Sequence, residues 1–186
     1  MTRSFVHANT LCLLLVSHPI GEAAGQALIV SGGPSIPKGP MALRRAVGSE
    51  VAIALGSEHH RRGFQFRVEF TRARFPTRFS AAETSSLDQG PLTINAGLAY
   101  LLYSSAPNVV SIHGGIAAGS YDMKIPGHYN PYGMVPGVGM LFGARFGAGR
   151  LRGLLEFQRH AILSDYGNDD FEWSTFTPVR FGFAIQ

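Results

Sequence analysis

The sequence predicts an all-β protein, an eight-stranded antiparallel up-and-down transmembrane β-barrel preceded by a cleaved signal peptide. Three observations favour this fold class. Apolar and polar residues alternate with period two in several segments, and the connections between these segments are alternately long and short. The polar faces carry few charges: only 15% of the 186 residues are charged, whereas well-behaved soluble surfaces are roughly 25–35% charged.

The N-terminal segment, residues 1–27, has the features of a secretory signal peptide. Arg3 supplies the positive region, residues 11–16 form a short apolar run, and a small-x-small cleavage site ends at residue 27. The mature chain, residues 28–186, is predicted to be a single barrel domain. Cys12, the chain's single cysteine, lies in the signal, so disulfides and thiolate metal sites are excluded from the mature protein.

Seven segments are predicted to be strands from their alternation, and residues 28–36 are predicted to be an eighth because bacterial outer-membrane barrels have even strand numbers. The last segment alternates most regularly, with Phe181 and Phe183 on one face and Arg180 on the other. The first segment is weakened by its glycines and by Pro34, which strand ends tolerate. The predicted strands are residues 28–36, 48–57, 64–71, 92–102, 110–119, 137–146, 151–160 and 177–186.

The connections between these strands place long loops at one end of the barrel and short turns at the other. In outer-membrane barrels the short turns face the periplasm and the long loops face outward. The long connections are residues 37–47, 76–90, 123–132 and 164–172, and the short ones are residues 58–62, 104–108 and 147–150.

Residue size indicates which face lines the lumen. An eight-stranded barrel is only wide enough to be filled by side chains, so the face of small and polar residues is predicted to point inward. The apolar faces, including Leu92 to Leu102 on alternate positions, are then predicted to meet lipid. Aromatic residues near strand ends are predicted to form interfacial girdles. They are Phe75, Phe79, Tyr100, Tyr103, Tyr121, Tyr129, Tyr132, Tyr166, Phe171 and Trp173.

Seven ionisable residues are predicted to face the lumen and to fill it with a structural network of salt bridges and hydrogen bonds. A narrow polar pore is the alternative. Glu156 and His160 lie four residues apart on one strand, about 13 Å by strand rise, which is too far for a direct acid–base pair. The predicted lumen residues are Arg67, Glu69, Arg145, Arg152, Glu156, His160 and Arg180.

No catalytic residue, cofactor or metal site is predicted, and the protein is expected not to be an enzyme. The histidines of residues 58–62 are expected in a solvated turn, and the aspartates of residues 165–170 lack calcium-loop spacing. The basic pI of 9.6 does not indicate nucleic-acid binding, because the arginines are scattered over strands and turns.

The signal, residues 33–39 (GPSIPKG) and residues 176–185 (FTPVRFGFAI) carry a resemblance to the small outer-membrane β-barrel domain proteins of Gram-negative bacteria, of the eight-stranded OmpA/OmpX-like type. The resemblance implies a location in the bacterial outer membrane and contact with its lipid. It also implies insertion by the barrel-assembly machinery, which reads the C-terminal strand. The residues matched to that insertion signal are Val179, Phe181, Phe183 and Ile185.

The resemblance departs from the family at the final residue, because such chains end on phenylalanine and this one ends on Gln186. The expected function is that of a monomeric integral outer-membrane protein, porin-like in architecture, with a structural or surface-interaction role in the cell envelope. The alternatives are a secreted or periplasmic soluble β-barrel that binds a small hydrophobic ligand, and a narrow pore.

Overall fold

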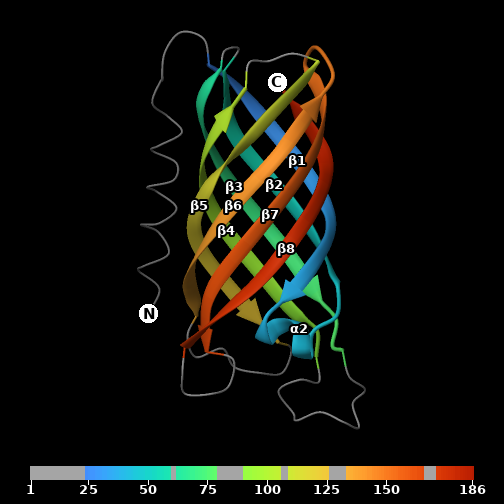
Figure 1. Ribbon diagram of the computed structural model, residues 1–186, viewed down its shortest axis with the longest axis vertical. Coiled ribbons are helices and arrows are strands. Elements are labelled where there is room, and N and C mark those ends of the chain that lie inside the picture. Colours follow the sequence, from blue (N-terminus) through green and yellow to red (C-terminus); the bar gives the residue numbers. More distant parts are fainter. Residues whose placement is uncertain (1–23, 60–61, 79–89, 106–108, 126–132, 166–170) are drawn as a thin grey trace.

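The computed structural model describes residues 24–59, 62–78, 90–105, 109–125, 133–165 and 171–186. These residues form one closed antiparallel barrel in which each strand pairs with its neighbours in sequence and the last strand pairs with the first (Figure 1). The predicted fold class is therefore confirmed. The strands are β1 (Ala24–Lys38), β2 (Gly48–His59), β3 (Gly63–Phe75), β4 (Leu92–Ser104), β5 (Val110–Lys124), β6 (Met134–Phe146), β7 (Leu151–Asp165) and β8 (Phe171–Ile185), and the short helix α2 spans Pro40–Arg44.

The first strand begins earlier than predicted. Ala24 pairs with His59, and the side chain of Ala27 is buried, so β1 includes four residues that the sequence assigned to the signal peptide. Most other strands also extend beyond their predicted bounds, mainly at the end where the long connections lie.

The register gives the strands a strong tilt. Following paired residues once around the barrel from Leu28 leads back to β1 at Lys38, ten residues further along. A closed barrel needs such a stagger, and the strands of such barrels tilt by roughly 35–45° to the axis. With eight strands in sequence order, β3 and β7 lie on opposite walls.

The two ends of the barrel differ. The long-loop end carries α2 and the connections after β1, β3, β5 and β7, whereas β1 starts and β8 finishes at the short-turn end (Figure 1). The segment that contains α2 is fixed to the chain after β3. Ala46 N–H donates to Pro76 O at 3.0 Å, and Arg78 N–H donates to Arg44 O at 3.1 Å.

Strand β4 has the opposite orientation to the predicted one. Leu98 and Tyr100 are buried inside the barrel, and Leu101 is 41% exposed on the outside. The reason is the register with β3, because directly paired residues lie on the same face of a sheet. Arg67 pairs with Tyr100, and Glu69 pairs with Leu98, so a lumen-facing Arg67 and Glu69 bring the apolar face of β4 inward.

Candidate functional site

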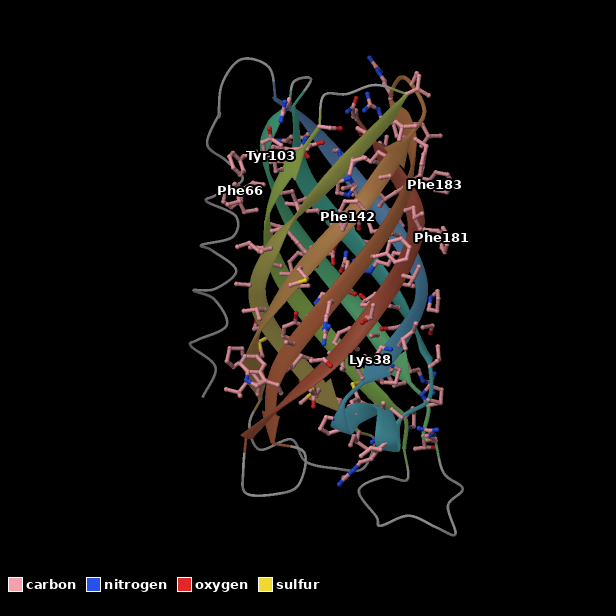
Figure 2. The ribbon with its side chains drawn as sticks, in the orientation of Figure 1. Lys38, Phe66, Tyr103, Phe142, Phe181 and Phe183 are labelled. Atoms are coloured by element: carbon pink, nitrogen blue, oxygen red, sulfur yellow. The ribbon has the colours of Figure 1, made fainter. Side chains whose placement is uncertain are left out.

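The outer wall of the barrel is an apolar belt. Phe66, Phe142, Phe181 and Phe183 project away from the strands, as does Tyr103 near the short-turn end (Figure 2). Side chains of this size exposed all around a barrel require an apolar surrounding. Exposed apolar residues of the belt include Val30, Ile53, Leu55, Phe64, Phe70, Ile112, Ile116, Val138, Met140, Leu151, Phe157 and Ile185.

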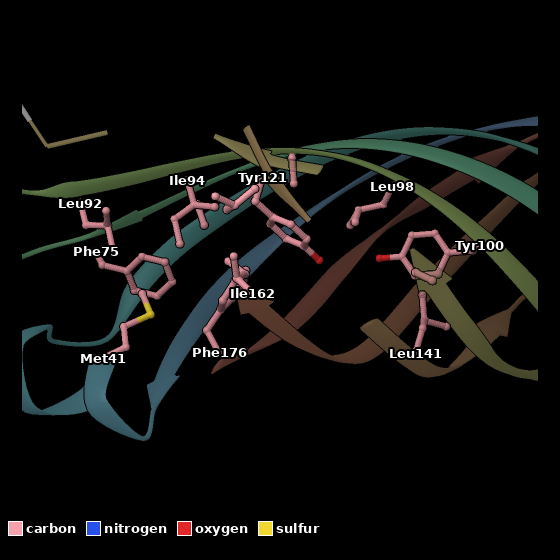
Figure 3. Close-up of a cluster of buried hydrophobic side chains, with 14 of the residues drawn as sticks. Met41, Phe75, Leu92, Ile94, Leu98, Tyr100, Tyr121, Leu141, Ile162 and Phe176 are labelled. Carbon is pink, nitrogen blue, oxygen red and sulfur yellow. The ribbon is translucent and has the colours of Figure 1, made fainter. Parts of the chain in front are cut away.

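The barrel interior at the long-loop end is filled by an apolar cluster. Helix α2 inserts Met41 beside Phe75, whose ring contacts Phe176 edge to face with centroids 5.5 Å apart (Figure 3). Tyr121 and Ile162 complete the cross-section from β5 and β7, and all five side chains are at most 1% exposed. This end of the lumen is therefore filled mainly by packed apolar side chains, although the polar side chains of Arg45 and Ser174 are also buried there.

Closer to the short-turn end than the apolar cluster, Arg67 on β3 connects opposite walls of the barrel. Its Nη1 lies 2.5 Å from Oε1 of Glu156 on β7, and its Nη2 lies 3.0 Å from Oε2 of the same carboxylate. Nη2 also lies 2.5 Å from Oε2 of Glu69, and the guanidinium carbon is 5.5 Å from the centre of the Tyr100 ring. One arginine thus binds two carboxylates, and its bond to Glu156 is bidentate.

Arg180 on β8 makes the second set of crossings. Its Nη1 donates to Oε1 of Glu69 at 2.6 Å, and its Nη2 contacts both a carboxylate oxygen of Glu50 and the Thr71 hydroxyl. The Thr71 hydroxyl donates to Glu50 at 2.5 Å. Glu50, Arg180, Glu69, Arg67 and Glu156 therefore alternate in charge along one continuous chain of ion pairs.

Neutral side chains extend this chain towards the apolar cluster. Gln158 donates from Nε2 to Glu156 at 3.2 Å, and its Oε1 lies 3.0 Å from Nε2 of His160. The Tyr121 hydroxyl lies 2.8 Å from the other ring nitrogen of His160, and the Tyr100 hydroxyl donates to Gln158 Oε1 at 3.1 Å. Glu156 and His160 do not touch each other, as predicted from their spacing, and Gln158 bridges them.

Strand β6 contributes space to this network. Gly143 faces the lumen, and a Cβ at this position would lie 2.9 Å from His113 Nε2 and 2.7 Å from the backbone oxygen of Leu155. His113 needs that space, because its Nε2 lies 2.9 Å from Oε1 of Glu156. Glycine therefore allows the side chains of β5 and β7 to meet in front of β6.

The structure places all seven predicted lumen residues on the inner wall. Arg67, Glu69, Glu156 and Arg180 form the ion-pair chain, and His160 joins it through Gln158. The other two, Arg145 and Arg152, lie nearer the short-turn end, where Arg145 is buried and Arg152 is half-buried.

Several network members were missed in the sequence. Glu50 on β2 and His113 on β5 lie at inward positions. On β2 the apolar residues Val51, Ile53 and Leu55 alternate in the sequence and are exposed in the structure. That alternation could have identified Glu50 as a lumen residue. No local signal marks Tyr100, because its face of β4 looks lipid-directed until the register with β3 is known.

The aromatic girdle prediction is wrong for three residues. Phe75, Tyr100 and Tyr121 point into the lumen and are fully buried, whereas Tyr103 and Trp173 are exposed on the outer wall. Closure decides these positions, because a residue near a strand end can lie on either face. The other predicted girdle residues are outside the part of the chain whose side chains the structure describes, as are residues 58–61 and 164–170.

The interior has the chemistry of a filled core. Each carboxylate of the ion-pair chain, Glu50, Glu69 and Glu156, is bound by an arginine. Charged groups buried in a medium of low dielectric constant need such partners. Within the described ranges there is no cluster of three or more metal-ligating side chains. No helix among the described residues is long and apolar enough to cross a membrane.

A closed barrel with an apolar outer belt and an ion-paired interior defines the class of membrane β-barrels. No protein-family model and no curated protein matches the sequence. Among solved structures, the crystal structure of Neisserial surface protein A (NspA) is similar, with a TM-score of 0.64 and 12% sequence identity, covering 88% of this chain and 99% of that chain. At this identity the similarity establishes the fold alone, a closed eight-stranded antiparallel barrel.

Proposed function

We propose that the protein is a monomeric integral protein of the bacterial outer membrane with a structural or surface-interaction role. The observation that carries this proposal is the inverted distribution of residues: Phe181 and Phe183 are about 60% exposed on the outer wall, while Arg67 and Arg180 are at most 1% exposed inside. A soluble barrel that binds a hydrophobic ligand would need the reverse arrangement.

The proposed role is neither catalytic nor conductive. The bidentate bond between Arg67 and Glu156 crosses the lumen, and the apolar cluster around Met41 and Phe75 fills the long-loop end. These two layers support a wall-to-wall filling by side chains. The long-loop end would then face the outside of the cell and present the variable surface, as in other outer-membrane barrels.

The C-terminal strand supports delivery by the barrel-assembly machinery. Phe181, Phe183 and Ile185 all face outward on β8, where a partner can read them before the barrel closes. Val179, on the same face, is half-buried. Replacing Phe183 with serine is expected to lower the amount of folded barrel in the outer membrane, whereas replacing Tyr103 with serine on the outer wall of β4 leaves that amount unchanged.

Membrane residence is tested by fractionation and gel migration. We expect the protein in the detergent-solubilised outer-membrane fraction, with unheated samples migrating differently from boiled ones because the closed barrel resists detergent. Recovery of folded protein in the soluble periplasmic fraction without detergent would contradict the proposal.

A further inference from the structure

We propose that a basic patch on the outer wall of β2, β3, β4 and β5 binds the phosphate group of a membrane lipid in the leaflet at the long-loop end. The proposal rests on the membrane residence and orientation proposed above. The patch is centred on Arg72 and Arg74, which are consecutive outward residues of β3. Its other members are Ser49, Thr93, Asn95, Asp122 and Lys124.

The patch lies where the apolar belt ends. On β3 the outward positions Phe64, Phe66, Val68 and Phe70 are apolar, and the next two outward positions towards the long-loop end are arginines. Phe70 is 60% exposed. A lipid whose acyl chains pack on this apolar stretch would carry its headgroup to the level of Arg72.

The register brings the polar members of the patch into two rows across the strands. Arg74 pairs with Thr93, which pairs with Lys124, so the two cations are two strands apart, roughly 10 Å. Arg72 pairs with Asn95, which pairs with Asp122 in the same way. Thr93 and Asn95 thus lie directly beside Arg74 and Arg72, and their hydroxyl and amide groups can also donate hydrogen bonds to a phosphate, while the carboxylate of Asp122 is paired with Lys124.

The arginines of the patch have unused hydrogen-bonding capacity. Asp122 binds Lys124 at 2.8 Å, and neither Arg72 nor Arg74 has a hydrogen bond or ion pair among the described residues. By contrast, the exposed Arg62 at the short-turn end donates from Nε to the Tyr103 hydroxyl at 2.6 Å. Two adjacent exposed guanidinium groups that have no partner among the described residues match the planar, bidentate geometry of phosphate oxygens.

The apolar surface beside the patch favours a lipid over a free anion as the occupant. Val51, Ile53 and Phe70 are each more than half exposed next to the patch, so the adjacent surface offers contacts for acyl chains that inorganic phosphate cannot use. The occupant that uses both parts of the surface is a phosphorylated lipid of the outer leaflet.

The test uses the full-length folded protein in detergent micelles with defined lipids, and native mass spectrometry measures lipid retention. The probes are bisphosphorylated lipid A, its dephosphorylated form and inorganic phosphate as a competitor. The double variant Arg72→Gln and Arg74→Gln is expected to retain bisphosphorylated lipid A roughly 10- to 30-fold less well than the unmodified protein. The matched control, Arg62→Gln with Arg150→Gln, removes two positive charges at the other end and is expected to leave retention unchanged.

Each outcome decides one point. Equal retention by the two double variants would overturn the proposal, as would equal retention of the dephosphorylated lipid. Displacement of the lipid by millimolar inorganic phosphate would identify a free-anion site and also overturn it. Heat-modifiable migration of every variant is measured in parallel, so that loss of the membrane barrel is distinguished from loss of the phosphate site.

Discussion

Arg67 on β3 and Glu156 on β7 are joined by a bidentate ion pair across the full width of the barrel, with both side chains at most 1% exposed. The two residues are 89 positions apart in sequence and lie on opposite walls, with three strands between β3 and β7 on each side. Such a pair ties the opposite walls together from within. The stability of the barrel should therefore depend on its interior ion pairs.

Replacing Arg67 with methionine is expected to lower the free energy of unfolding by about 3–5 kcal/mol, because it leaves two buried carboxylates, Glu156 and Glu69, without this partner. Urea unfolding in lipid vesicles, followed by the fluorescence of Trp173, measures the change. Arg159→Met, on the exposed outer wall, is the control and should not destabilise the barrel. A loss below 1 kcal/mol for the Arg67 variant would show that the network contributes little.

Replacing Gly143 with alanine is expected to destabilise the barrel by about 1–3 kcal/mol, since the new methyl group would meet the backbone of Leu155 and the His113 ring. Gly153→Ala is the matched control on the next strand, where the nearest atom is the Phe146 backbone oxygen at 3.8 Å. The same unfolding measurement applies. Equal effects of the two substitutions would contradict the role of Gly143 as a space for the network.

Because the apolar face of β4 points into the lumen, fluorophores at the neighbouring positions 101 and 102 should differ in their quenching by lipid. In a Cys12→Ser background, a fluorophore on Leu101→Cys should be quenched by nitroxide-labelled lipids, because Leu101 is exposed on the outer wall. A fluorophore on Leu102→Cys should not be quenched, because Leu102 is 1% exposed inside the barrel. The opposite pattern would restore the orientation predicted from hydrophobicity.

Helix α2 provides a comparison between two apolar residues of the same turn. Met41→Ala removes a fully buried side chain from the apolar cluster and is expected to cost about 2–5 kcal/mol. Leu43→Ala removes a side chain that is 67% exposed and is expected to be close to neutral. Indistinguishable unfolding midpoints would show that α2 does not seal the long-loop end.

The strand pattern could be read from the sequence because period-two alternation is local. Phe181, Arg180 and Phe183 indicate the two faces of β8 without any other strand. The interior could be predicted only in part. Arg67 and Glu156 can be placed on lumen faces, but their bidentate contact depends on the ten-residue stagger, which no single strand encodes.

Strand β4 shows why hydrophobicity alone fails inside a small barrel. Leu98 and Tyr100 read as lipid-facing, yet their pairing with Glu69 and Arg67 brings them inward. The apolar layer at the long-loop end likewise depends on α2, a helix of five residues with no recognisable periodicity. Both features result from closure and from long-range packing rather than from local pattern.

Side chains fill the lumen from wall to wall, so single-channel recording in a planar bilayer should detect no open pore. The purified protein, first verified as heat-modifiable, should give no stable conductance steps over a range of voltages. A variant in which Met41 and Phe75 are replaced with alanine lacks part of the apolar cluster. The difference between its conductance and that of the unmodified protein measures how far the apolar cluster blocks the lumen. Steady, ohmic conductance steps from the unmodified protein would show that the lumen is open.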